Sequence, residues 1–147
     1  MKRFRFDLEK IFEIRAYREQ EAEIELGRAL GILTALEREI QSVAAARVKA
    51  ASCRFAPGNG SDEILRYDLY IRRLDAQRDR LVKEAAEAEL KVEEARRVFL
   101  EASRERKVFD KLKEKRRQEY RGIFLAEETK TLDDIAGGSA VRRLWGA

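Results

Sequence analysis

The stretch Phe55-Ala56-Pro57-Gly58-Asn59-Gly60 divides this chain of 147 residues into two unequal parts. Pro57 is the only proline in the sequence, and glycines follow it at positions 58 and 60. Proline breaks the interior of a helix, and glycine readily adopts the left-handed conformation that tight turns require. The sequence on both sides is rich in Ala, Leu, Glu, Lys and Arg, which favour helix. We therefore expect two helices joined by one turn.

The composition favours long paired helices over a thick globular core. Charged residues make up 41% of the chain and aromatic residues only 8%. No segment has the polar and apolar alternation of a strand. The predicted fold is therefore all-α, an antiparallel two-helix coiled-coil hairpin that forms a single domain over residues 1–147. We expect the first helix at about residues 7–53, the turn at 54–61, the second helix at 62–136, and a flexible tail at 137–147 after Gly137 and Gly138.

Both predicted helices carry mostly apolar residues at alternating spacings of four and three, the pattern of a coiled-coil seam. In the first helix the seam positions are Leu8, Phe12, Arg15, Glu19, Ala22, Leu26, Ala29, Leu33, Leu36, Ile40, Val43, Arg47 and Ala50. In the second they are Tyr67, Ile71, Leu74, Arg78, Leu81, Ala85, Ala88, Val92, Ala95, Phe99, Ala102, Arg106 and Phe109, and the pattern then weakens through Lys113, Arg116, Tyr120 and Ile123.

If the two seams pair symmetrically about Pro57, Leu33 faces Leu81 and Arg5 faces Phe109, although a shift of two residues also fits. In this register the second helix has no partner beyond about residue 111 and overhangs as far as Ala136. A single helix is only marginally stable in water. The overhang should fray or be held by another molecule.

The positive charge of the chain is concentrated near the start of the predicted overhang. The net charge is only +4, yet nine basic residues and four acidic ones lie between Arg104 and Arg121. An outward stripe at three- and four-residue spacing contains Arg104, Lys107, Lys111 and Lys115. Two interpretations stay open: the stripe is an ordinary solvated helix face, or it binds an acidic partner.

Two apolar groups are further candidates for binding a protein. The first, on the predicted overhang, comprises Tyr120, Ile123 and Phe124. The second lies near the hairpin tip, where Leu69 and Tyr70 stand beside the seam residue Leu74. Clustered aromatic and aliphatic side chains are typical of interface centres. Alternatively, the loop residues Phe55 and Ala56 fold back over the tip group.

The sequence offers no candidate catalytic, cofactor-binding or metal-binding residue. It has no histidine, and its single Cys53 cannot form an intramolecular disulfide. It also lacks a glycine-rich phosphate-binding loop. We therefore expect a non-enzymatic protein without cofactors. The N-terminus Met1-Lys2-Arg3 is not followed by an apolar core, so we expect no signal peptide, no transmembrane segment and a cytoplasmic location.

Three sequence features resemble the FliJ family of the flagellar type III export apparatus. They are the start Phe4-x-Phe6-x-Leu8, the stretch Tyr67-x-x-Tyr70-Ile71-x-x-Leu74, and the segment from Arg104 to Arg116. The last of these is followed by Tyr120, Glu128, Lys130 and Leu132-Asp133-Asp134, where that family commonly ends its long helix. The resemblance covers nearly the whole chain. This chain departs from the family in its longer glycine-bearing loop and its tryptophan-containing tail.

The resemblance implies a stalk-like antiparallel coiled coil that inserts into the ring of the export ATPase hexamer. It also implies binding to the cytoplasmic domain of the export gate, a link to export chaperones, and peripheral association with the inner face of the membrane. Tyr70 and Leu74, together with Leu69, then fall on the gate side at the tip. The basic segment and the turns after it fall on the ATPase side.

Other functions remain open at this point. The basic segment also fits a coiled-coil arm that binds nucleic acid, although interrupting acidic residues make us expect no nucleic acid partner. A stalk subunit of a rotary ATPase or of an injectisome would have a similar pattern. The oligomeric state is open too, because the apolar overhang could pair with a second copy.

Overall fold

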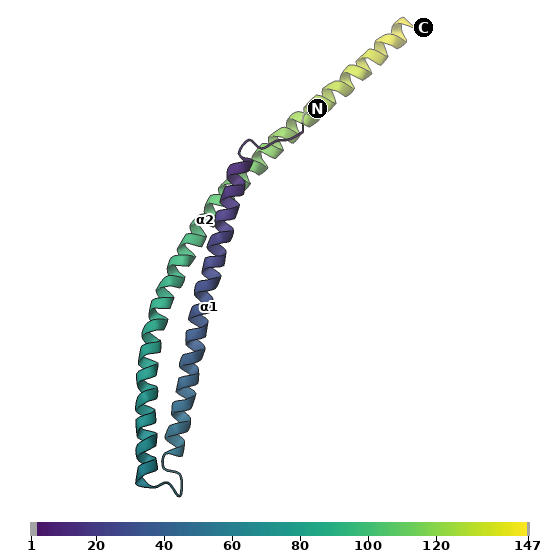
Figure 1. Cartoon of the computed structure of the whole chain (residues 1–147). Helices are drawn as coiled ribbons and strands as arrows, with labels where there is room; N and C mark the ends of the chain where they lie inside the picture. Colours follow the sequence, from purple (N-terminus) through teal and green to yellow (C-terminus); the bar gives the residue numbers. More distant parts are fainter. Residues whose placement is uncertain (1–2, 147) are drawn as a thin grey trace. The chain divides into compact units, whose positions relative to one another are not determined.

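The computed structural model describes residues 3–146, which form two long helices (Figure 1). Helix α1 spans Glu9–Cys53 and helix α2 spans Ser61–Trp145, and no strand is present among the described residues. The predicted all-α, two-helix class is therefore confirmed. Met1 and Lys2 of the N-terminus, and Ala147 of the predicted tail, lie outside the described residues.

The chain divides into two compact units, and each contains part of both helices. The first, which we call the hairpin unit, is Arg18–Ala102. The second, the terminal unit, consists of Met1–Tyr17 together with Ser103–Ala147. The loop belongs to the hairpin unit, whereas the basic segment belongs to the terminal unit.

In the hairpin unit α1 and α2 run side by side in opposite directions from the loop (Figure 1). Val43, Leu74 and Leu81 are buried between them, and Leu36 and Ile40 pack against this cluster. Every predicted seam position between residues 19 and 50 on α1, and between 67 and 102 on α2, is buried or half-buried. The periodicity of the sequence therefore identified the contact faces of both helices in this unit.

The loop closes α1 with a side-chain cap. Gly58 has φ of 95°, a left-handed conformation that glycine adopts without steric cost. The next residue, Asn59, donates from Nδ2 to the carbonyl oxygens of Cys53 at 2.9 Å and Arg54 at 3.2 Å. Carbonyls at the end of a helix have no partner within the helix, so these bonds satisfy them. Asn59 thus fixes the path of the chain between the two helices.

The register of the hairpin differs from the one predicted about Pro57. Arg47 pairs with Asp75 at 2.6 Å and Arg54 pairs with Asp68 at 2.7 Å, whereas symmetry about Pro57 would place Arg47 opposite Tyr67. The predicted register is therefore wrong by about one heptad. The reason lies in the loop: Arg54, which directly follows α1, contacts the third turn of α2. The first two turns of α2 consequently lie beside the loop and not beside α1.

In the terminal unit the N-terminal residues accompany α2 further than predicted. Arg15 pairs with Glu105, and Glu9 binds the Lys113 ammonium group at 2.7 Å. The Phe4 ring lies 5.5 Å from the Tyr120 ring, measured between centroids. The expected loss of a partner near residue 111 is therefore wrong, because contacts reach Tyr120.

Beyond Tyr120 the helix continues through Gly137 and Gly138 to Trp145. The predicted helix end at Ala136 is wrong, because neither glycine takes the positive φ with which glycine commonly ends a helix. We call residues 121–145 the C-terminal segment. No ion pair, side-chain hydrogen bond or aromatic contact in the structure joins this segment to the rest of residues 3–146.

Candidate partner-binding surfaces

The acidic side chains of the basic segment are all engaged by other basic residues. Glu105 pairs with Arg15 of the N-terminal part. The other three pair along α2, and these pairs are Arg106–Asp110, Arg117–Glu114 at 3.9 Å and Arg116–Glu119 at 3.6 Å. No carboxylate of this segment is left to neutralise additional positive charge.

None of the four cations of the predicted stripe has a counterion, and Arg121 at the end of the basic segment also forms no ion pair within residues 3–146. Arg104, Lys107, Lys111 and Lys115 are exposed, and none forms an ion pair within residues 3–146. At three- and four-residue spacing they share one face of α2, where like charges cost about 0.2–0.5 kcal/mol per pair. We call these four residues the basic stripe. An acidic surface placed against it would remove the repulsion.

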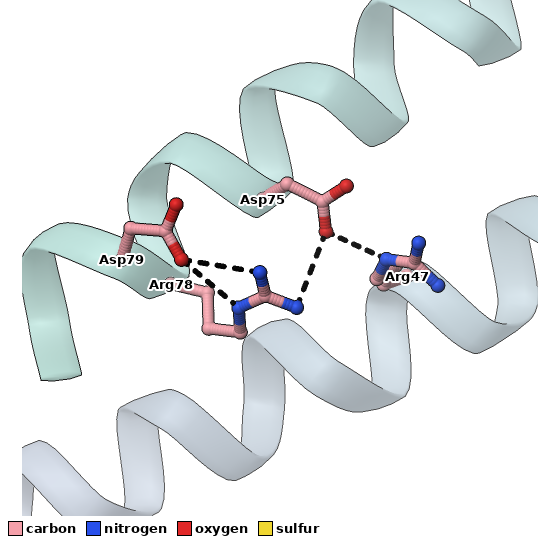
Figure 2. A network of polar contacts seen from close by, with 4 residues as sticks. All are labelled: Arg47, Asp75, Arg78 and Asp79. Carbon is pink, nitrogen blue, oxygen red and sulfur yellow. Dashed lines mark hydrogen bonds and ion pairs between the residues drawn. The ribbon is translucent and has the colours of Figure 1, made fainter.

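Arginines at seam positions are bound in a different way, as Figure 2 shows. Arg47 donates from Nε to Asp75 Oδ1 at 2.6 Å, and Arg78 approaches the same oxygen at 3.6 Å. Arg78 also binds Asp79 at 3.1 Å. These half-buried cations have counterions from the hairpin itself. They therefore serve the packing of α1 on α2 and offer no free charge to a partner.

The exposed face of the hairpin unit carries a second cluster in which an arginine is paired with carboxylates of the same unit. Arg97 binds Glu94 at 2.6 Å and Glu101 at 2.9 Å. The hydrogen bond and the charge of Arg97 lower the pKa of Glu94, and the two carboxylates raise the pKa of Arg97. The positive charge of Arg97 is thus matched within the cluster, unlike the charges of the basic stripe.

The predicted apolar group after the basic segment is only partly available. Tyr120 is half-buried and its ring packs with Phe4, and Phe124 is also half-buried. Ile123 is 60% exposed. The structure therefore brings Tyr120 into the terminal unit as a packing residue and leaves Ile123 as the open member of the group.

At the hairpin tip, the three predicted residues have two different environments. Leu69 and Tyr70 are exposed, whereas Leu74 is buried in the core against Val43 and Leu81. Leu74 offers no accessible surface to a partner in this conformation. Its heptad position had already indicated the seam, and the burial follows from it.

Loop residue Phe55 does not cover the tip. Phe55 is itself 71% exposed, and the Arg54 guanidinium lies 4.8 Å from its ring centroid. Leu65 is also exposed, one turn before Leu69 on the same helix face. Sequence reasoning missed Leu65, although its four-residue spacing from Leu69 outside the seam was a usable signal.

A shallow hollow adjoins these apolar residues. Its volume is about 370 Å³, and it is lined by Asn59, Glu63, Arg66, Tyr67 and Tyr70. The exposed tip surface thus combines apolar side chains (Phe55, Leu65, Leu69 and Tyr70) with a few polar groups beside them.

The comparison with known protein families is decisive for identity. The family described as flagellar FliJ protein matches residues 4–144. The chain belongs to the FliJ family. It is therefore a coiled-coil protein of the flagellar export system. No match was found among curated proteins, and none among solved structures.

Two further searches cover the described part of the chain. Residues 3–146 contain no cluster of three or more His, Cys, Asp and Glu side chains that could hold a metal ion. No helix in this range has an apolar stretch long enough to cross a membrane.

Proposed function

We propose that this FliJ-family chain is a non-enzymatic, stalk-like component of flagellar export that binds the export ATPase hexamer through its terminal unit and the export gate through its hairpin tip. The observation that carries the proposal is the basic stripe. Its four cations are exposed and unpaired, while all four carboxylates of the same segment are already engaged.

The charge arrangement favours an acidic protein surface as the ATPase-side partner. An acidic ring interior would relieve the repulsion along the stripe and would guide association over distances of about a Debye length. Ile123 lies beyond the stripe and supplies exposed apolar area for the same contact. Tyr120 and Phe124 support this face from within the terminal unit.

On the gate side, the proposal rests on the exposed tip residues Leu69 and Tyr70, with Phe55 and Leu65 beside them. Apolar and aromatic side chains of this kind contribute most of the binding energy in many interfaces. Leu74 acts beneath this surface by holding α2 against α1. Binding to the cytoplasmic domain of the gate would place the protein peripherally at the inner face of the membrane. A role with export chaperones enters the proposal through the family resemblance alone.

The ATPase contact can be tested with the purified chain and the cognate export ATPase. The wild-type chain should raise the rate of ATP hydrolysis and the hexameric fraction of the ATPase. The triple variant Lys107→Glu, Lys111→Glu, Lys115→Glu should lose most of this effect, because repulsion replaces attraction. A matched control, Lys83→Glu, Lys91→Glu, Arg96→Glu, makes the same charge change on exposed residues of the hairpin unit and should behave like the wild type.

Each outcome bears on the proposal. An active ATPase that does not respond to the wild-type chain would contradict the stalk function. Equal loss in both triple variants would show that net charge alone is responsible. Tight binding to mixed RNA or DNA that is lost steeply with added salt, without any ATPase response, would favour the nucleic-acid arm instead.

The gate contact needs its own experiment. The double variant Leu69→Ala, Tyr70→Ala should bind the cytoplasmic domain of the gate at least about tenfold more weakly in calorimetry, since central interface residues each contribute about 1–2 kcal/mol. Leu90→Ala is the control, because Leu90 is also exposed but lies elsewhere on α2. Unchanged affinity of the double variant would remove the tip from the proposal.

A further inference from the structure

The C-terminal segment forms no ion pair, side-chain hydrogen bond or ring contact with other parts of residues 3–146. Three of its large apolar side chains are mostly exposed, with Leu132 at 65%, Ile135 at 60% and Trp145 at 87%. Most of the stability of helices in proteins comes from packing of one face, and each glycine in a helix interior costs about 1 kcal/mol relative to alanine. The helical form of Gly137 and Gly138 therefore calls for stabilisation by another surface.

Two opposite charges of the segment lie at equal distances from Ile135 along the sequence. Glu128 precedes Ile135 by seven residues and Arg142 follows it by seven, which is two helical turns each way and brings all three onto one face. Neither charged residue forms an ion pair within residues 3–146. Arg142 Nε instead lies 3.4 Å from the carbonyl oxygen of Gly138 in its own helix.

Side-chain size follows the same symmetry. Leu132 stands three residues before Ile135 and Gly138 three residues after it. A Cβ atom added at Gly138 would meet only the end of the Arg142 side chain, at 4.0 Å, so the backbone there is open to close approach. Large residues opposite small ones are what interdigitated helices require.

We infer that the C-terminal segment is a self-association surface on which a second copy of this chain packs in antiparallel orientation, centred on Ile135. In that arrangement Glu128 of each copy faces Arg142 of the other, Ile135 packs against its own equivalent, and Leu132 fits over Gly138. This is an isologous contact, in which one surface is complementary to itself. A parallel pair would place Glu128 against Glu128 and is disfavoured.

The inference is independent of the proposed function, because it requires neither the ATPase nor the gate. It does have a consequence for that function. A paired C-terminal segment is covered in the free protein, so a partner that binds this segment would have to displace the second copy.

The experiment measures the mass of the full chain by sedimentation equilibrium over a concentration series, in reducing buffer so that Cys53 does not cross-link copies. As the concentration increases, the average mass of the wild-type protein should rise from the monomer mass of 17.1 kDa toward twice that value. Glu128→Arg and Arg142→Glu should each weaken association at least about tenfold, because each creates like charges at both symmetric positions. An equal mixture of these two single variants should associate again, since the two chains are then complementary. The double variant Glu128→Arg, Arg142→Glu should also recover.

Matched controls are available on the opposite face of the same helix. Asp133→Arg and Lys130→Glu make the same charge changes about 160° and 140° away from Ile135 around the helix, and they should associate like the wild type. A chain that stays monomeric at every concentration would overturn the inference. If the two single variants associated as strongly as the wild type, the contact would lie elsewhere on the chain. If the mixture of the two variants did not associate, the two copies would not pair in the antiparallel orientation. Either result would also overturn the inference. Circular dichroism of each variant verifies that the hairpin helices remain folded.

Discussion

Arg47 on α1 donates from Nε to Oδ1 of Asp75 on α2 at a distance of 2.6 Å, and both residues are only half-buried (Figure 2). Arg47 occupies a seam position, so its charge would be poorly solvated without this carboxylate. The same oxygen also accepts a longer contact from Arg78 at 3.6 Å. Polar seam residues of this kind fix the register of a coiled coil at some cost in stability.

Asp75→Asn should therefore destabilise the hairpin more than an ordinary surface change. We expect the free energy of unfolding in urea to fall by about 1 kcal/mol, because two half-buried arginines lose their shared counterion. Asp79→Asn is the control and should cost less, since within residues 3–146 Asp79 forms an ion pair with Arg78 alone. A double-mutant cycle with Arg47→Ala measures the ion pair itself. If the losses of unfolding free energy from Asp75→Asn and Arg47→Ala are additive, the ion pair does not contribute to stability.

Leu81→Ala tests the position of the seam. Leu81 is 3% exposed, so its truncation leaves a cavity between α1 and α2 and should lower the unfolding free energy by about 2–5 kcal/mol. Leu90→Ala, on an exposed position of the same helix, should change it by less than about 0.5 kcal/mol. If the two variants had equal midpoints in chemical denaturation, the predicted seam would not be the buried face of α2.

The contact faces of the helices could be predicted from the sequence, whereas their register could not. Burial follows the four-three spacing because a narrow apolar stripe has only one way to leave water, and residues such as Val43, Leu74 and Leu81 are buried as expected. Register depends on the path of a single loop. The loop includes the hydrogen bonds of Asn59 to the end of α1, and the ion pairs Arg47–Asp75 and Arg54–Asp68 show a register about one heptad from the predicted one. No repeat in the sequence encodes the path of this loop.

The candidate surfaces were predictable to different degrees. The basic stripe follows from charge spacing, but its lack of counterions depends on which carboxylates are engaged, and Glu105 is engaged by the distant Arg15. At the tip, the family resemblance pointed to Leu74, which the structure buries. The exposure of Phe55 depends on the loop path, which a residue pattern does not specify.

Phe4→Ala tests the extended contact of the terminal unit. Loss of the ring contact with Tyr120 should weaken the docking of the N-terminal residues by about 1 kcal/mol. Hydrogen exchange of backbone amides at residues 113–120 should then accelerate by about fivefold. Phe55→Ala removes an exposed ring at the tip and should leave these amides unchanged. No difference between the two variants would contradict the contact.

Glu94→Gln tests the exposed charge cluster through pH. Arg97 lowers the pKa of Glu94 in the folded chain, so the ionised Glu94 stabilises the folded state. This stabilisation is fully present above the pKa of Glu94 in the unfolded chain, about 4.3, and is lost as the pH falls through the lower pKa of the folded chain. The wild-type melting temperature should therefore exceed that of Glu94→Gln slightly at neutral pH and low salt. This difference should vanish in acid, and also in about 1 M NaCl, where screening acts within about 3 Å. If the difference in melting temperature grew on acidification, Arg97 would not lower the pKa of Glu94 in the folded chain.

Gly137→Ala tests whether intrinsic helix propensity limits the C-terminal segment. Position 137 has room for a methyl group, because nothing lies within 4 Å of a Cβ atom added there, and it points away from the Ile135 face. Alanine should therefore strengthen the helix by about 1 kcal/mol and leave the side chains of the Ile135 face unchanged. Tryptic cleavage after Arg142 and Arg143 should slow severalfold, as measured by mass spectrometry over time. Ala136→Gly, the reverse change one residue earlier, should accelerate it. If neither substitution alters the cleavage rate, local helix opening does not control access to these sites.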